Sequence, residues 1–170
     1  MWIRSLELGG LTMNVQKIGS RFEQDFKSSV SDYILRLRSM QGFKGTDNPG
    51  DFLVYNGKYI LFIECKTIKE GRFNLSNLRA MQLWKLVEAC SNPNVFGGYL
   101  IYIRKTQECF FIETGKFLFW YLTRDRQSIP YSWMKENGLL VPMQLKRTRY
   151  RYDIDTIYKW VEENCYVAQT

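Results

Sequence analysis

The sequence predicts an α/β fold in which a mixed β-sheet of about four or five strands is flanked by helices. Residues 49–66 contain two apolar, β-rich runs on either side of an Asn-Gly pair. This pair is the strongest short-range signal for a β-hairpin, because a type I′ turn needs positive φ at both central residues. Hydrophobic periodicity also predicts helices at 15–40 and 76–90 and strands at 98–104 and 108–113.

The predicted hairpin brings two carboxylates together. A two-residue loop at the Asn-Gly pair would make Asp51 the partner of Phe62 and the diagonal neighbour of Glu64, on the same face of the sheet. The Cα atoms of the two acids would then be roughly 7–8 Å apart. Both acids lie in runs that otherwise resemble buried strands, where an unpaired charge is costly. Two carboxylates at this separation can bind one divalent cation.

This pair suggests a metal-dependent mechanism. Asp51 and Glu64 would hold Mg²⁺ or Mn²⁺, which prefer oxygen ligands, and the backbone carbonyl of Cys65 can supply another. Lys66 would orient the attacking water or stabilise charge that develops on a phosphate. The alternative is an ordinary hairpin, in which Asp51 caps a turn and the Glu-x-Lys end is solvated. The Asp…Glu-x-Lys pattern alone does not decide between the two.

Composition narrows the function further. The chain has 170 residues, of which 45% are hydrophobic and 16% aromatic, so we expect one domain with a packed core. Its formal net charge of +7 favours a polyanionic partner. The sequence contains no histidine, which excludes histidine-based triads, His-ligated zinc and HNH-type nuclease chemistry.

The remaining global features predict a cytoplasmic protein. The four cysteines are widely spaced and lack a C-x-x-C motif, so we expect reduced thiols. No apolar run reaches the length of a membrane span, and the N-terminus lacks the apolar core of a signal peptide. Met13 offers an alternative start. We therefore expect residues 1–12 to be an extension and residues 13–170 to form a single nuclease domain.

Two side chains on the predicted helices have alternative roles. Glu23 lies at the edge of the apolar stripe of the first helix, where it is either a solvated first-turn acid or a third acid over the metal site. Periodicity alone favours the solvated acid. Gln82 lies on or near the inner face of the second helix, where a buried amide needs partners. The residues predicted to face inward on that helix are Leu78, Met81, Leu86 and Ala89.

The C-terminal third adds a basic segment. Residues 146–152 alternate cations with aromatic rings, which suits contacts with phosphates and bases but also fits a solvated edge strand. Residues 115–124 and 154–164 are predicted helices, and Asp153 is the predicted N-cap of the latter. Together with the basic loop at 67–72, the candidate DNA-binding side chains are Lys69, Arg72, Lys146, Arg147, Arg149 and Arg151.

The order of these elements resembles the PD-(D/E)xK nuclease superfamily, and within it the RecU-type Holliday-junction resolvases of Gram-positive bacteria and their phages. The resemblance covers nearly everything from Met13 onwards. The Glu-x-Lys motif is weakly specific, whereas the Phe-x-Leu-x-Asn…Gln motif behind it is far more so. The stretches that carry the resemblance are 19–23, 51–66, 73–82 and 128–153.

The resemblance implies a restriction-endonuclease-like core and an Mg²⁺- or Mn²⁺-dependent endodeoxyribonuclease. It makes Asp51 and Glu64 metal ligands and Lys66 the catalytic lysine. It makes Glu23 a supporting acid, against the preference from periodicity, and Gln82 an orienting residue. The substrate would be a four-way DNA junction, cut by a homodimer through paired nicks. The family's basic stalk, inserted before the strand that carries Asp51, is expected to be short or absent, because only a short loop follows the predicted first helix.

Two alternatives stay open. The chain can be another PD-(D/E)xK nuclease, of the flap-cutting or restriction type. It can also be a non-catalytic, basic DNA-binding module with a decayed site. The intact set of Asp51, Glu64, Lys66 and Gln82 argues against decay.

Overall fold

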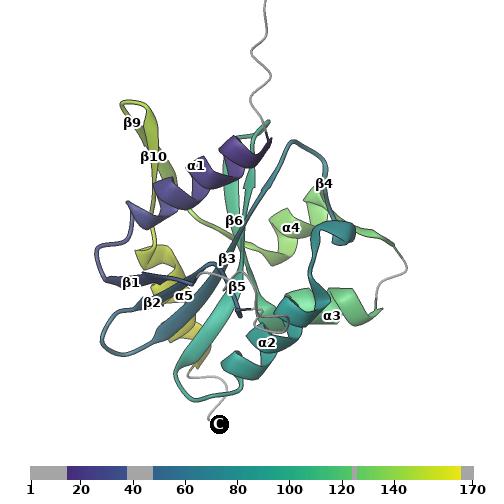
Figure 1. Cartoon of the computed structure of the whole chain (residues 1–170). Coiled ribbons are helices and arrows are strands. Elements are labelled where there is room, and N and C mark those ends of the chain that lie inside the picture. The colour runs from purple at the N-terminus through teal and green to yellow at the C-terminus, as the bar shows by residue number, and fades with distance from the viewer. Residues whose placement is uncertain (1–14, 38–47, 124–125, 166–170) are drawn as a thin grey trace, which may run out of the picture.

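A six-stranded mixed sheet forms the centre of the protein (Figure 1). The computed structural model describes residues 15–37, 48–123 and 126–165; the predicted extension at 1–12 lies outside them. Strands β3 and β5 are parallel and the other neighbours are antiparallel, so the prediction of a mixed α/β sheet is confirmed. In spatial order the strands are β1 (Tyr33–Arg36), β2 (Phe52–Tyr55), β3 (Ile60–Ile68), β5 (Val95–Ile103), β6 (Glu108–Glu113) and β8 (Leu139–Leu140).

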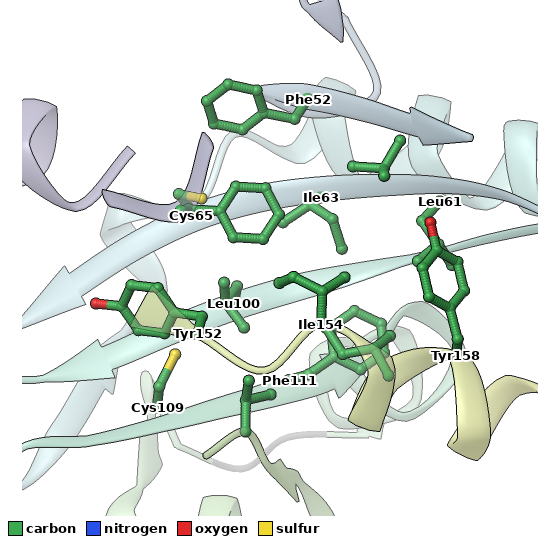
Figure 2. Packing of buried hydrophobic residues seen from close by; sticks show 14 of the residues in the cluster. Phe52, Leu61, Ile63, Cys65, Leu100, Cys109, Phe111, Tyr152, Ile154 and Tyr158 are labelled. Atoms are coloured by element: carbon green, nitrogen blue, oxygen red, sulfur yellow. The ribbon is translucent and has the colours of Figure 1, made fainter. Parts of the chain in front are cut away.

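Helices cover both faces of this sheet and enclose two hydrophobic clusters. Alternate residues of β3 point to opposite clusters, so Leu61 and Ile63 face the first (Figure 2) and Phe62 faces the second. The first cluster includes α1 (Val15–Lys27), α5 (Asp155–Cys165) and a hairpin of β9 (Met143–Lys146) and β10 (Arg149–Tyr152). The second includes α2 (Ala80–Cys90), α3 (Thr114–Thr123), α4 (Tyr131–Asn137) and the pair β4 (Arg72–Asn74) and β7 (Ser128–Pro130). No helix in the described ranges is long and apolar enough to span a membrane.

The first helix is shorter than predicted. It ends at Lys27, and residues 33–36 form β1, an edge strand antiparallel to β2. Ser28 and Ser29 donate hydroxyl hydrogen bonds to carbonyl groups four residues back, a geometry typical of a helix end. The Tyr-Ile-Leu segment that follows favours a strand and gains pairing with β2. The connection before Asp51 is therefore not a short loop but residues 28–50, of which 38–47 lie outside the described part.

The predicted hairpin exists, but its register was wrong by two residues. Tyr55 pairs with Ile60, so residues 56–59 form a four-residue loop. The Asn56 side chain accepts hydrogen bonds from two backbone amides of this loop, and Gly57 takes a φ of 92° that suits glycine. Tyr59 is buried and contacts the ring of Phe96 edge-on, which favours the longer loop. A shift of two keeps every side chain on its predicted face.

The second helix begins later than predicted. A 3-10 turn (Leu75–Asn77) precedes α2, whose buried residues are Gln82, Leu83 and Leu86. Met81 is 60% exposed, so its predicted inward position was wrong. The inner position of Gln82 is confirmed.

Candidate active site

Asp51 lies directly before β2, at the point where β2 stops pairing with β3. β2 begins at Phe52 whereas β3 continues to Ile68, so the end of β3 has no β2 partner. The backbone amide of Asp51 donates to the Ile63 carbonyl at 2.9 Å, and its carboxylate accepts the Cys65 amide at 2.8 Å. These two bonds fix the carboxylate against the exposed edge of β3. The last residues paired are Phe52 and Ile63, so Asp51 lies just beyond the ladder, beside Glu64 and Cys65.

Gly50 allows this close approach. A Cβ atom at Gly50 would lie 2.9 Å from the Ile63 carbonyl oxygen, which is a backbone atom within the sheet. Any larger residue would therefore push the chain away from β3. The local sequence gives no signal for this role of Gly50, because the contact depends on the observed register.

Glu64 is the centre of the site. Its side chain is only 3% exposed and faces the α2 side of the sheet. One carboxylate oxygen forms a 2.6 Å ion pair with Lys66, and the other accepts a 2.7 Å hydrogen bond from the Gln82 amide. The fold therefore brings together three of the predicted site residues, from two different elements.

The charge of this cluster is not balanced. Burial, and then the neighbouring Asp51 carboxylate, raise the pKa of Glu64 from 4.5 to about 7, although Lys66 opposes the shift. A divalent cation beside Asp51 and Glu64 would relieve this repulsion, and two carboxylates are a usual protein contribution to Mg²⁺, which keeps several waters. The donor set thus fits such an ion. Among the described residues, no cluster of three or more acidic, cysteine or histidine side chains forms a larger metal site.

Glu23 reaches the same region from α1. It forms an ion pair with Arg36 of β1, and its side chain is 21% exposed. Burial, followed by the charge of Asp51, raises its pKa. Glu23 is therefore close to the acid pair rather than fully solvated. Arg36 was missed because its segment was assigned to a helix, whereas pairing with β2 brings it to the site.

Tyr99 is a second residue that the sequence did not reveal. It is the parallel neighbour of Glu64 on β5, and its ring stacks on Phe117 at 4.1 Å. Its hydroxyl is buried and has no hydrogen-bond partner among the described residues. Burial, and then the charges of Glu64 and Asp51, raise its pKa. An apolar run such as Gly-Gly-Tyr-Leu-Ile gives no signal for this position.

The basic residues are distributed over two surfaces. Lys69 and Arg72 are exposed where β3 ends and β4 begins. The run 146–151 forms the turn and most of β10 in the β9–β10 hairpin, which stands beside α1 (Figure 1). Within it, Arg149 is 3.1 Å from Asp25 in an ion pair, and Arg151 donates to the Tyr150 carbonyl, so both also support the structure.

The mixed sheet with helices on both faces has the fold of the PD-(D/E)xK class, and Glu64, Lys66 and Gln82 meet on it. The chain belongs to the family of Recombination protein U, RecU, which matches residues 19–154. It is thus a Holliday junction resolvase, a DNA-binding endonuclease of recombination.

Comparison with other proteins agrees at the level of the fold. A similar solved structure is Hjc of Archaeoglobus fulgidus, a Holliday junction resolvase from an archaeal hyperthermophile. The TM-score is 0.51 with 22% sequence identity, over 72% of this chain and 95% of Hjc. Among curated proteins, none matches the chain.

The close approach at Gly50 yields a first prediction. Gly50→Ala should lower nicking of branched DNA by about 100-fold, because a displacement of Asp51 on the order of 1 Å disturbs the reacting geometry. Initial rates should be compared with those of Gly19→Ala, where a Cβ atom meets nothing within 4 Å. Equal rates for the two variants would show that Asp51 does not depend on this contact.

The raised pKa of Glu64 yields a second prediction, for the metal-free protein. Between pH 4.5 and about 7 the folded state holds a proton that the unfolded state releases, so this contribution to stability is lost as the pH rises. The Glu64→Gln variant has no carboxyl proton at this position, so its stability does not contain this pH-dependent contribution. The free energy of unfolding of Glu64→Gln, measured with urea in EDTA, should therefore rise relative to wild type from pH 5 to pH 8. The exposed Glu163→Gln is the control, and a pH-independent difference for Glu64→Gln would contradict the assignment.

Proposed function

We propose that the protein cuts branched DNA with Mg²⁺ or Mn²⁺, using Asp51, Glu64 and Lys66. The observation that carries this proposal is the buried Glu64, which faces a second carboxylate and is bonded to both Lys66 and Gln82. A structural ion pair needs only one acid. A second acid that raises the pKa of the first is typical of a site that awaits a cation.

Asp51 and Glu64 would hold the cation, with the Cys65 carbonyl as a further ligand. When bound, the ion supplies a water of lowered pKa and neutralises charge on the phosphate. The Cys65 amide holds Asp51 in place at 2.8 Å, so the carboxylate does not need to be ordered by the ion itself. This preorganisation is expected to strengthen metal affinity.

The other residues act on charge and orientation. Lys66, whose ammonium group is 2.6 Å from Glu64, orients the attacking water or stabilises negative charge on the phosphate. Gln82 fixes the second oxygen of Glu64, so it positions a ligand without supplying charge. Glu23 adds negative potential beside Asp51 and is restrained by Arg36.

DNA is bound by the two basic surfaces. Lys69 and Arg72 lie next to the strand that carries the site, and Lys146, Arg147, Arg149 and Arg151 extend the positive surface along the β9–β10 hairpin. A net charge of +7 supports such binding, which releases counterions from the phosphates.

We further propose a homodimer. A four-way junction is two-fold symmetric, so paired nicks need two sites related by a two-fold axis. Large apolar side chains are exposed on the two packed helices α2 and α3, which a second copy can cover. These side chains are Met81, Trp84, Phe119 and Leu122.

The central prediction concerns catalysis. Asp51→Asn and Glu64→Gln should each lower Mg²⁺-dependent nicking by about a thousandfold or more, because each removes a charge that holds the ion. Lys66→Ala should be comparably impaired. Gln82→Ala should be milder, on the order of 10- to 100-fold, because the amide only orients Glu64.

Two assays on the same four variants test this prediction. Nicking is measured on four-way, flap and linear DNA, and binding is measured by gel shift in EDTA. Binding should survive in Asp51→Asn, Glu64→Gln and Gln82→Ala, because none of these substitutions removes a contact to phosphate. Lys66→Ala removes a positive charge next to the phosphate and should bind somewhat more weakly. Full nicking by Asp51→Asn would end the metal-nuclease proposal. Preferred cleavage of flaps or linear DNA by wild type would favour another nuclease of the same fold.

The dimer has its own test. Light scattering at micromolar concentration should give twice the mass of the chain, and the double variant Trp84→Asp, Phe119→Asp should give a monomer, because a buried carboxylate is costly in an apolar interface. A monomeric wild type, with or without DNA, would contradict paired nicking.

A further inference from the structure

A hollow lies outside the active site, between α1, the end of β5 and the β9–β10 hairpin. Its volume is about 430 Å³, within the range of ligand pockets. We propose that this hollow, called here the tyrosine pocket, binds an unpaired base of the DNA substrate. The proposal rests on the proposed function, because it takes the ligand to be DNA. The pocket is defined by Phe22, Tyr102, Arg104, Tyr150 and Tyr152.

Aromatic rings form the base of the pocket. Phe22 and Tyr152 are nearly fully buried, with ring centroids 5.4 Å apart. Tyr152 lies at one end of the first hydrophobic cluster (Figure 2). Tyr102 and Tyr150 are only partly buried, with centroids 5.9 Å apart. Partly exposed rings fixed on a rigid base are the usual platform on which single-stranded nucleic acid stacks.

The charges around the pocket favour a nucleotide over a purely apolar ligand. The lining contains Arg21, Arg104 and Arg147, none of which forms an ion pair with a carboxylate in the described ranges. The Arg104 Nε is buried and has no hydrogen-bond partner there. The acid of the lining, Asp25, is already neutralised by Arg149 at 3.1 Å. The pocket therefore keeps a positive charge that a phosphate can balance.

The hairpin tip is held in place over the pocket. Arg21 of α1 donates a hydrogen bond to the Thr148 carbonyl, and the backbone amide of Tyr150 donates to Asp25. Arg147 takes a positive φ of 58°, as the first residue of the two-residue turn between Lys146 and Arg149. The pocket is thus formed before any ligand binds.

The position of the pocket relates it to the active site. Tyr102 is the parallel neighbour of Thr67, the residue after Lys66, and the Arg104 amide bonds to the Ile68 carbonyl at 3.1 Å. On α1, Phe22 lines the pocket while the next residue, Glu23, approaches the acid pair. The pocket and the acid pair share one end of the sheet but lie on its opposite faces, so a DNA strand that reaches both must pass around the end of β3 and β5.

Only an unpaired base fits this arrangement. In a duplex both faces of a base are covered by the neighbouring bases. A base that enters the concave pocket must therefore first leave the stack. Branch points supply such bases at low energetic cost, whereas regular duplex does not. The pocket would therefore favour branched over linear DNA through a contact that the phosphate-binding residues cannot make.

The test uses single-stranded oligonucleotides with one 2-aminopurine, whose fluorescence falls on stacking, and a duplex of the same sequence, both in EDTA. Wild type should quench the fluorescence, and Tyr150→Leu should weaken single-strand binding about tenfold, the effect of one lost stacking contact. Tyr150→Phe should restore binding, because the ring remains. Tyr55→Leu, an exposed tyrosine on β2, is the matched control. Duplex affinity should be the same for all of these variants.

Absent quenching by wild type would overturn the proposal, as would equal losses of single-strand and duplex binding in Tyr150→Leu. If Tyr150→Leu does not fold, Arg104→Gln decides, since it should weaken single-strand binding several-fold and leave duplex binding unchanged. Because EDTA prevents cleavage, these results do not depend on the proposed catalysis. If wild type quenches the fluorescence but Asp51→Asn still cuts DNA, the pocket proposal stands and the catalytic one fails. If Asp51→Asn is inactive but wild type does not quench, the catalytic proposal stands and the pocket proposal fails.

Discussion

The ion pair between Glu64 and Lys66 is the interaction on which the rest of the structure depends. A carboxylate that is 3% exposed is tolerated only because an ammonium group and an amide saturate its two oxygens. Each partner requires a different part of the fold. Lys66 needs β3 to continue beyond β2, and Gln82 needs α2 to cross the same face of the sheet.

The two hydrophobic clusters make this arrangement rigid. Cys65, between the two charged residues in sequence, points into the first cluster, while Glu64 and Lys66 point to the other face. The strand is thus anchored from behind by apolar packing and presents its charges in front. A site fixed in this way loses little entropy when it binds a cation or a phosphate.

Much of this site could be predicted from the sequence, because alternation along strands decides which side chains share a face. The shared face of Asp51 and Glu64 and the inner position of Gln82 follow from local pattern, whereas the register of the hairpin does not. The end of the first helix does not, because Val30, Tyr33 and Leu37 fit helical spacing although pairing with β2 turns residues 33–36 into a strand. Contacts that depend on tertiary register, such as those of Gly50, Arg36 and Tyr99, give no local signal.

The four-residue loop at 56–59 joins the two strands in the one register that serves the catalytic hairpin. A slip of β3 against β2 by a single residue would turn Glu64 and Lys66 to the α1 side. A slip of two residues would keep the face and change only how far along the strand each acid stands. The pairing next to this loop therefore governs the chemistry, even though the loop lies at the opposite end of the hairpin.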